Sequence, residues 1–315
     1  MTTAPMHGDL SLSDNTARGV VYMAMGISYL QEAVVSARSL RRHHKEPILL
    51  FTDQYQRAVA EGIFDEVVPL ERSGLLPHRP HRDKLVAMRR SPFRQTLFLD
   101  TDTFVAGSLA DGWELLERFD LAFAGDRGYV DHFPADTEVP DSFKEPNLGV
   151  VFFRSSEALD WLWQDALNLY DQLAASADVG PLPSFTDQTP FRLVLYRSSL
   201  RFTALTDEYN CRLSNYGKLN GPVRILHGRL PCARHNERNL HWVAEQLNAT
   251  HAPRVFVAGR HWALMPSWLP VANPYRAKFM PSFQRIEWMP VAIAMRRWLG
   301  SLIRDALRWK SRRGS

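Results

Sequence analysis

Short apolar runs alternate with segments of helical spacing along the first part of the chain, and this alternation restricts the fold more than any other feature. The run GVVYMAM at 19–25 is continuous and too short for a helix, which indicates a buried strand. The segment at 28–44 repeats its apolar residues on one helical face. Four more strands and two more helices are predicted, at 46–53, 64–70, 96–100 and 120–125 and at 81–90 and 108–119. The pattern predicts an α/β fold with a mostly parallel sheet and helices on both faces.

The second part of the chain continues the pattern with longer interruptions. It contains predicted strands at 147–154, 201–205 and 223–228, a helix at 156–175 and a helix that begins near Asp187. We expect a disordered start at 1–17, one domain over 18–265 and a tail over 266–315.

Composition excludes several classes of protein. The 315 residues are 45% hydrophobic and 23% charged, as in an ordinary globular protein. Cys211 and Cys232 are the only cysteines, too few for a disulfide framework, so a reducing compartment is expected. The polar start lacks the apolar core of a signal peptide, and no apolar run reaches the roughly 18 residues of a membrane span. A cytoplasmic location is therefore expected.

Positive charge is concentrated at the end of the chain. Residues 285–315 contain eight Lys and Arg but two Asp and Glu, so residues 1–284 are slightly acidic and show no signature of nucleic-acid binding. The segment 289–313 has an apolar stripe at helical spacing with arginines at its margins, which predicts a basic amphipathic helix. Such a helix could lie on an anionic membrane surface, dock on the domain or self-associate. The first alternative would make the protein peripheral on the inner membrane face.

The stretch TLFLDTDTFV ends an apolar strand with two carboxylates, Asp100 and Asp102. In extended backbone, residues i and i+2 point to the same side, so both would project from the carboxyl end of the strand, where open α/β sheets bind ligands. Two close carboxylates repel each other unless a positive charge lies between them. Mn²⁺ or Mg²⁺ would supply that charge.

Two enzyme classes share this pattern. The sequence FLDTDT matches the nucleophile motif of haloacid-dehalogenase-like phosphatases, in which Asp100 would be the nucleophile. In that class the motif usually lies on the first strand, whereas three predicted strands precede it here. The following GDRGYVD also comes too soon to leave room for the intervening motifs.

The other class is the glycosyltransferases of the GT-A fold, which is Rossmann-like. The order of motifs over residues 19–230 resembles glycogenin and the related glycosyltransferase family 8 proteins. The resemblance implies a metal-dependent hexosyltransferase, retaining in outcome, that uses a nucleotide sugar such as a UDP-sugar. Its acceptor is not implied, and a polysaccharide or a lipid-linked acceptor would both fit.

The resemblance also implies where the donor nucleotide binds. Within VYMAMGISYL, the backbone of Ala24, Met25 and Gly26 would lie near the base and ribose, and Tyr29 would lie against the uracil ring. The sequence departs from the family at Ile27, where Asp or Asn is common, and this puts uridine itself in doubt.

Later motifs supply the remaining residues of the expected site. Lys84, within DKLVAMRR, matches a lysine that contacts the nucleotide phosphates. Asn147, in the strand NLGVVFF, and the pair Asp187 and Gln188, in TDQTPF, match residues that contact the sugar. In the same strand, Gly149 would let the backbone approach closely.

The last motif, VRILHG, matches a strand whose histidine is the third metal ligand, so His227 would join Asp100 and Asp102 around Mn²⁺ or Mg²⁺. The family's Lys-Pro-Trp is absent after it, and Arg229 or Arg234 would supply the phosphate-facing cation. Asp126 and Asp187 are the candidates for a catalytic carboxylate. A protein that binds the donor without turnover is a third alternative.

Overall fold

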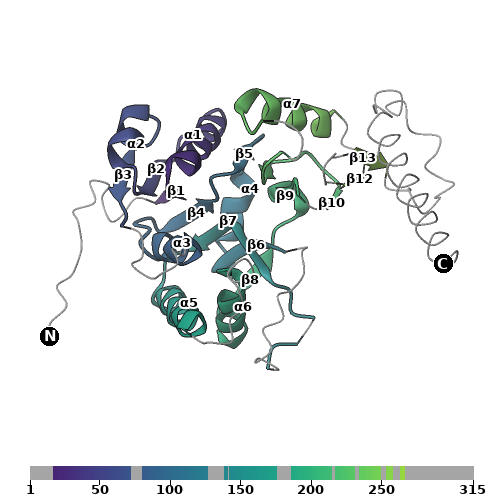
Figure 1. Ribbon diagram of the computed structural model, residues 1–315. Coiled ribbons are helices and arrows are strands. Elements are labelled where there is room, and N and C mark those ends of the chain that lie inside the picture. The colour runs from purple at the N-terminus through teal and green to yellow at the C-terminus, as the bar shows by residue number, and fades with distance from the viewer. Residues whose placement is uncertain are drawn as a thin grey trace, which may run out of the picture.

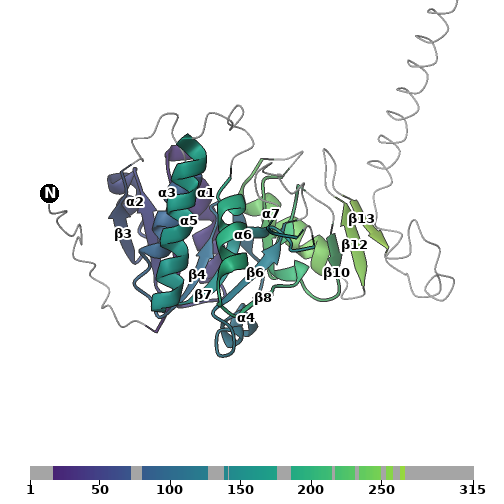
Figure 2. The same cartoon turned by 90° about the horizontal axis from the view of Figure 1, so that it is seen from below.

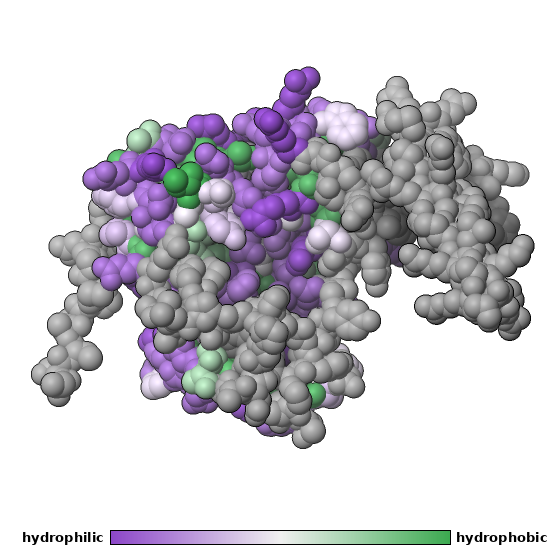
Figure 3. Space-filling view, viewed as in Figure 1, coloured by the Kyte–Doolittle hydropathy of each residue, from purple (hydrophilic) through white to green (hydrophobic). Residues whose placement is uncertain are grey.

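The computed structural model describes residues 17–71, 80–126, 138–140, 142–175, 186–214, 217–230, 234–249, 253–257 and 263–266. Of the predicted disordered start (1–17), only residue 17 is described, and of the predicted tail (266–315), only residue 266 is described. The predicted helix at 289–313 lies outside the described residues. Among the described helices, none is long and apolar enough to cross a membrane. In the view of Figure 3 the described surface is mostly hydrophilic, with apolar residues scattered over it.

A seven-stranded sheet forms the centre of the protein (Figure 1). In spatial order its strands are β3 (Glu66–Pro69), β2 (Ile48–Thr52), β1 (Arg18–Ala24), β4 (Gln95–Leu99), β7 (Pro146–Arg154), β6 (Leu121–Gly125) and β8 (Phe202–Ala204). Neighbouring strands are parallel except where β7 pairs antiparallel with β4 and β6. The predicted mostly parallel sheet is therefore confirmed.

Helices cover both faces of this sheet, as Figures 1 and 2 show. One apolar core contains residues of α1 (Ile27–Arg41), α2 (Tyr55–Glu61) and α4 (Ala110–Leu115). The other core contains residues of α3 (Pro80–Arg89), α5 (Glu157–Ala175) and α6 (Gln188–Arg197). The strands supply alternate residues to the two cores. In β1, for example, Val20 and Tyr22 belong to the first core and Val21 to the second, as the two-residue period of a strand requires.

Two small sheets lie beside the central one. The first joins β5 (Thr103–Val105), β11 (Ile225–His227) and β9 (Cys211–Arg212). The second joins β10 (Gly217–Leu219), β12 (Arg254–Val257) and β13 (Ala263–Pro266). Helix α7 (Glu237–Asn248) contributes to a third apolar core together with β5, β9 and β11. The sheet β5-β11-β9 matters most for function, because it brings two distant segments to the carboxyl end of β4.

Candidate metal centre

Asp100 and Asp102 lie in the turn that joins β4 to β5. The expectation that both belong to extended backbone is therefore wrong, and it is the turn that brings their carboxylates together. Strand β5 pairs antiparallel with β11, which sets His227 opposite Thr103. The backbone N–H of Gly228 donates to the carbonyl of Asp102 at 2.9 Å and fixes the end of β11 against the turn. Pairing between strands thus joins the three predicted metal ligands.

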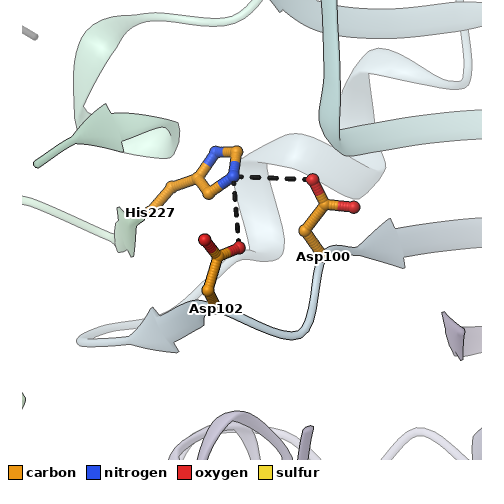
Figure 4. Close-up of side chains that lie close together, drawn as sticks. All are labelled: Asp100, Asp102 and His227. Carbon is orange, nitrogen blue, oxygen red and sulfur yellow. Dashed lines mark ion pairs between the residues drawn. The ribbon is translucent and has the colours of Figure 1, made fainter. Parts of the chain in front are cut away.

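The three side chains point toward one another (Figure 4). His227 Nε2 lies 3.5 Å from Asp100 Oδ2 and 3.6 Å from Asp102 Oδ1. One ligand atom from each of the three residues lies within 4.8 Å of the others. Two carboxylates and one imidazole form a donor set that suits Mn²⁺ and accommodates Mg²⁺. The residues present therefore fit a divalent cation.

Gly149 provides the space that this cluster needs. The carbonyl of Gly149, on β7, accepts a hydrogen bond from the Asp100 N–H at 2.8 Å, so its Cα faces the cluster closely. A Cβ at this position would lie 2.1 Å from Cε1 of His227 and 2.7 Å from Oδ2 of Asp100. Both distances are far inside normal contact, so only glycine fits. Close approach at Gly149 was predicted, and the groups that approach are two of the predicted metal ligands, Asp100 and His227.

Lys84 is buried and paired with two carboxylates. Its Nζ lies 2.8 Å from Asp100 Oδ1 and 3.4 Å from Asp187 Oδ2. Only 7% of Lys84 is exposed, so it is not a solvated lysine of a surface helix. Asp187 directly precedes α6 but its side chain does not cap the helix. Instead, Asp187 Oδ1 lies 3.2 Å from Nδ1 of His81.

Electrostatics keep these buried groups charged. Burial raises the pKa of Asp100, but Lys84 and His227 outweigh it, and the pKa lies well below the ordinary value. Burial lowers the pKa of Lys84, but Asp100 and Asp187 outweigh it, and the pKa lies above the ordinary value. The pKa of Asp187 is lowered because Lys84 and His81 outweigh the effect of burial. At neutral pH the carboxylates of Asp100 and Asp187 are therefore joined by the ammonium of Lys84.

Arg229 lies on the other side of the cluster. Its Nε and Nη2 donate to Glu32 at 2.6 and 2.8 Å, and this pairing raises the pKa of the guanidinium. Nη1 lies 4.0 Å from Asp102 Oδ2, and the guanidinium carbon lies 5.5 Å from the centre of the Tyr29 ring. Arg234 is exposed, and within the described part of the chain no ion pair joins it to these carboxylates. Of the two predicted alternatives, Arg229 is the one beside the cluster.

The predicted nucleotide loop connects β1 to α1. Ala24 and Met25 are buried, whereas Tyr29 is 42% exposed and is not a core aromatic residue. Gly26 has φ of 104°, a conformation that favours glycine, and its N–H donates to Asp53 Oδ1 at 2.6 Å. Sequence reasoning missed Asp53, although its position directly after the predicted second strand was a usable signal.

A buried chain of hydrogen bonds connects His227 with Asp126. Nδ1 of His227 lies 2.7 Å from Oδ1 of Asn210, and Nδ2 of Asn210 donates to Oδ1 of Asn147 at 2.8 Å. Nδ2 of Asn147 donates to Oδ2 of Asp126 at 2.9 Å, and Arg212 donates to the same oxygen at 3.3 Å. Sequence reasoning selected His227, Asn147 and Asp126 but missed Asn210 and Arg212. The last predicted residue, Gln188, is the first residue of α6 and is half-buried.

These groups gather at one end of the strands of the central sheet. Asp100 follows β4, the nucleotide loop follows β1, Asp53 follows β2 and Asp126 follows β6. All four strands run in the same direction, so the groups lie at their carboxyl ends, where open α/β sheets bind ligands.

No protein-family model matches the sequence, and a comparison with curated proteins finds no match. Among solved structures, the galactosyltransferase LgtC in complex with donor and acceptor sugar analogs is 15% identical, with a TM-score of 0.50 over 73% of this chain and 93% of that one. An active-site mutant of LgtC is 16% identical, with the same coverage and TM-score. The chain has the GT-A fold.

The glycosyltransferase GlyE from Streptococcus pneumoniae TIGR4 is also similar, at 17% identity and a TM-score of 0.46 over 72% of this chain. This chain spans 60% of the length of GlyE. At these identities the likeness concerns the fold.

Proposed function

We propose that the protein is a metal-dependent glycosyltransferase that transfers a sugar from a nucleoside diphosphate, with UDP-sugars as the first donors to test. The observation that carries this proposal is the cluster of Asp100, Asp102 and His227 at the carboxyl ends of the strands of a GT-A sheet. Two positive side chains flank the cluster, Lys84 beside Asp100 and Arg229 beside Asp102. A diphosphate bound at such a cation would have a positive side chain on either side, Lys84 and Arg229.

Each residue of the cluster has a role in this proposal. Asp100, Asp102 and His227 would hold Mn²⁺ or Mg²⁺, which acts as a Lewis acid on the departing diphosphate. The ammonium of Lys84 and the guanidinium of Arg229 would stabilise the negative charge that develops on the diphosphate, because carboxylates already hold both groups in place.

The nucleoside would lie over the loop after β1. Tyr29 offers an exposed ring to the base, and the backbone of Ala24, Met25 and Gly26 borders the base and ribose. Arg229 lies against the Tyr29 ring. The guanidinium that we propose contacts the diphosphate would therefore lie next to the ring that we propose contacts the base.

The two candidate catalytic carboxylates differ in their surroundings. The Asp126 side chain is 14% exposed and is oriented by Asn147 and Arg212. The Asp187 side chain is 2% exposed and is paired with His81 and Lys84. We propose that Asp126 faces the sugar and that Asp187 positions Lys84. A same-face attack guided by the leaving phosphate would need neither as a nucleophile.

Asn147 and Gln188 remain proposed sugar contacts, with a restriction on Asn147. Its amide oxygen already accepts from Gly149 N–H at 3.2 Å and from Asn210, and one of its two N–H groups goes to Asp126. An amide has two acceptor lone pairs and two donors, so one N–H is left for a ligand. Asn147 could therefore donate one hydrogen bond to a sugar hydroxyl.

A donor panel tests the function directly. Purified protein is incubated with Mn²⁺ and a series of nucleotide sugars, and release of the nucleoside diphosphate is measured with and without a chelator. We expect release that requires the metal, that is lost in Asp102→Asn, and that persists in Asp165→Asn, a control at an exposed position of α5. Equal activity in Asp102→Asn and in the native protein would reject the metal site.

Two alternatives predict other results. A protein that binds the donor without turnover would show donor binding by calorimetry but no diphosphate release. A phosphatase would form a covalent phosphate on Asp100 and act without any nucleotide. The phosphatase is not favoured, because the solved structures of similar fold described above are glycosyltransferases.

A membrane-surface location, with a lipid-linked acceptor, is a proposal that rests on the sequence of 289–313 alone. The full chain and a chain that ends before Pro290 would be sedimented with vesicles of anionic lipid. Equal vesicle binding by both chains would contradict a role for this segment, and loss of binding in the shorter chain would support it.

A further inference from the structure

The hydrogen bonds around Asn147 and Asn210 admit a single orientation of both amides. The backbone N–H of Gly149 can only donate, and it lies 3.2 Å from Asn147, so the Asn147 atom that faces it is the oxygen. The Nδ2 of Asn147 is then the atom that faces Asp126 at 2.9 Å, and a carboxylate there accepts its hydrogen. The backbone at one end and the carboxylate at the other agree on this orientation.

The orientation of Asn147 determines that of Asn210. The oxygen of Asn147 lies 2.8 Å from the Asn210 side chain and needs a donor there, so Asn210 presents Nδ2 to it. The Oδ1 of Asn210 consequently faces Nδ1 of His227 at 2.7 Å. An amide oxygen only accepts, so Nδ1 of His227 must carry a hydrogen.

We infer that Asn210 is a positioning residue that keeps a hydrogen of His227 on Nδ1 and so leaves Nε2, which faces Asp100 and Asp102, as the nitrogen that binds a cation between them. A histidine binds a metal through the nitrogen without hydrogen, and the partner of its other nitrogen decides which one that is. The backbone N–H of Gly149 determines which atom donates and which accepts in every hydrogen bond from Asn147 to His227. Gly149 therefore both makes room for the His227 ring and determines its protonated nitrogen.

Strand pairing and burial make this arrangement stable. Asn210 directly precedes β9, which pairs parallel with β11 in the register that sets Cys211 opposite Leu226. Asn147 is 3% exposed and Asn210 is 6% exposed, so neither amide turns toward bulk water. A buried amide that rotated would set oxygen against oxygen at Asn147, which is costly without solvent.

The hydrogen on Nδ1 is expected with or without a metal, whereas the role of Nε2 in metal binding rests on the proposed function. Protein with ¹⁵N-labelled histidine is studied by long-range ¹H–¹⁵N correlation, and the pH is raised until the ring of His227 is neutral. The signal of His227 among the 11 histidines is assigned by its absence in His227→Gln. We expect the Nδ1-protonated pattern, and an Nε2-protonated pattern in the native protein would overturn the inference.

Two variants of Asn210 separate positioning from packing. Asn210→Leu keeps the approximate volume but removes the acceptor, so we expect loss of the Nδ1 tautomer and Mn²⁺ affinity weaker by about 10- to 100-fold in calorimetry. Asn210→Asp keeps an acceptor for His227 but sets a carboxylate oxygen against Oδ1 of Asn147, so we expect a lower free energy of unfolding together with the native tautomer and Mn²⁺ affinity no weaker than native. Asn168→Leu, at an exposed position of α5, is the control and should change neither quantity.

The outcomes distinguish the inference from the proposed function. Native tautomer and native Mn²⁺ affinity in Asn210→Leu would overturn the role of Asn210, as would equal loss of both in Asn210→Asp. If Asn210→Leu does not fold, the native protein and Asn210→Asp still decide by their tautomers. A native protein with the expected tautomer that binds no Mn²⁺ would support the orientation and refute the metal-dependent function.

Discussion

Replacing Gly149 by alanine should disable the metal centre with a single methyl group. The new Cβ would lie 2.1 Å from Cε1 of His227, whereas carbon atoms in contact lie about 3.5 to 4.0 Å apart. The ring would have to retreat by about 1.4 Å or more to reach that separation. It cannot do so freely, because Nδ1 is bound to Asn210 and the backbone belongs to β11. Metal–ligand distances tolerate deviations of only about 0.2 Å.

Two measurements check this prediction. Overpacking of this kind costs about 1 to 3 kcal/mol, so Gly149→Ala should lower the free energy of unfolding by that amount in urea titrations. Its Mn²⁺ affinity in calorimetry should fall by at least about 10-fold, because a ligand is displaced. The control is Gly221→Ala, since a Cβ at Gly221 would meet nothing within 4 Å. If Gly149→Ala bound Mn²⁺ as tightly as Gly221→Ala and unfolded at the same urea concentration, the close approach would not exist.

Three further predictions concern the charged groups. Lys84→Met leaves the carboxylates of Asp100 and Asp187 without their ammonium, so the free energy of unfolding in urea should fall by about 3 to 5 kcal/mol. Arg229→Met should raise the KM for the nucleotide sugar at least several-fold, while Arg234→Met should leave it unchanged, and equal effects in diphosphate-release assays would argue against a special role for Arg229. Because the pKa of Asp187 is lowered in the folded protein, its ionised carboxylate stabilises the folded state at pH values above its ordinary pKa of about 4. This contribution is lost as the pH falls below that value. Between pH 5 and pH 3, a range of about two units around that value, the urea midpoint of unfolding should therefore decrease less for Asp187→Asn than for the native protein.

The sequence predicts the central sheet well because its inner strands, β1, β2, β4, β6 and β7, are buried on both faces and appear as continuous apolar runs. Helix α1 is equally legible, and the five residues on its predicted face are all buried: Leu30, Ala33, Val34, Ala37 and Leu40. Helix α2 was missed because it buries only Ala58 and so has no apolar stripe. Helix α7 was missed although its buried residues, Leu240, Val243, Ala244 and Leu247, follow helical spacing.

The candidate site was predicted where residues belong to contiguous motifs, and missed where tertiary pairing brings residues together. Asp100 and His227 each end an apolar run, Asp102 follows Asp100 by two residues, and the structure joins all three. Asn210 precedes a strand of two residues and Arg212 ends it, and this strand is too short for any periodic signal. Their contacts depend on the register of β9 with β11, which no local pattern encodes.

The pairing of β5 with β11 also has a consequence for the order in which the protein folds. The two strands are far apart in the sequence, and three strands of the central sheet, β6, β7 and β8, lie between them along the chain. Contacts of such wide separation form late, because the intervening loop must close before they are gained. The cluster is thus a reporter of nearly complete folding, and a chain interrupted before Ile225 would carry both aspartates without the ability to assemble the centre.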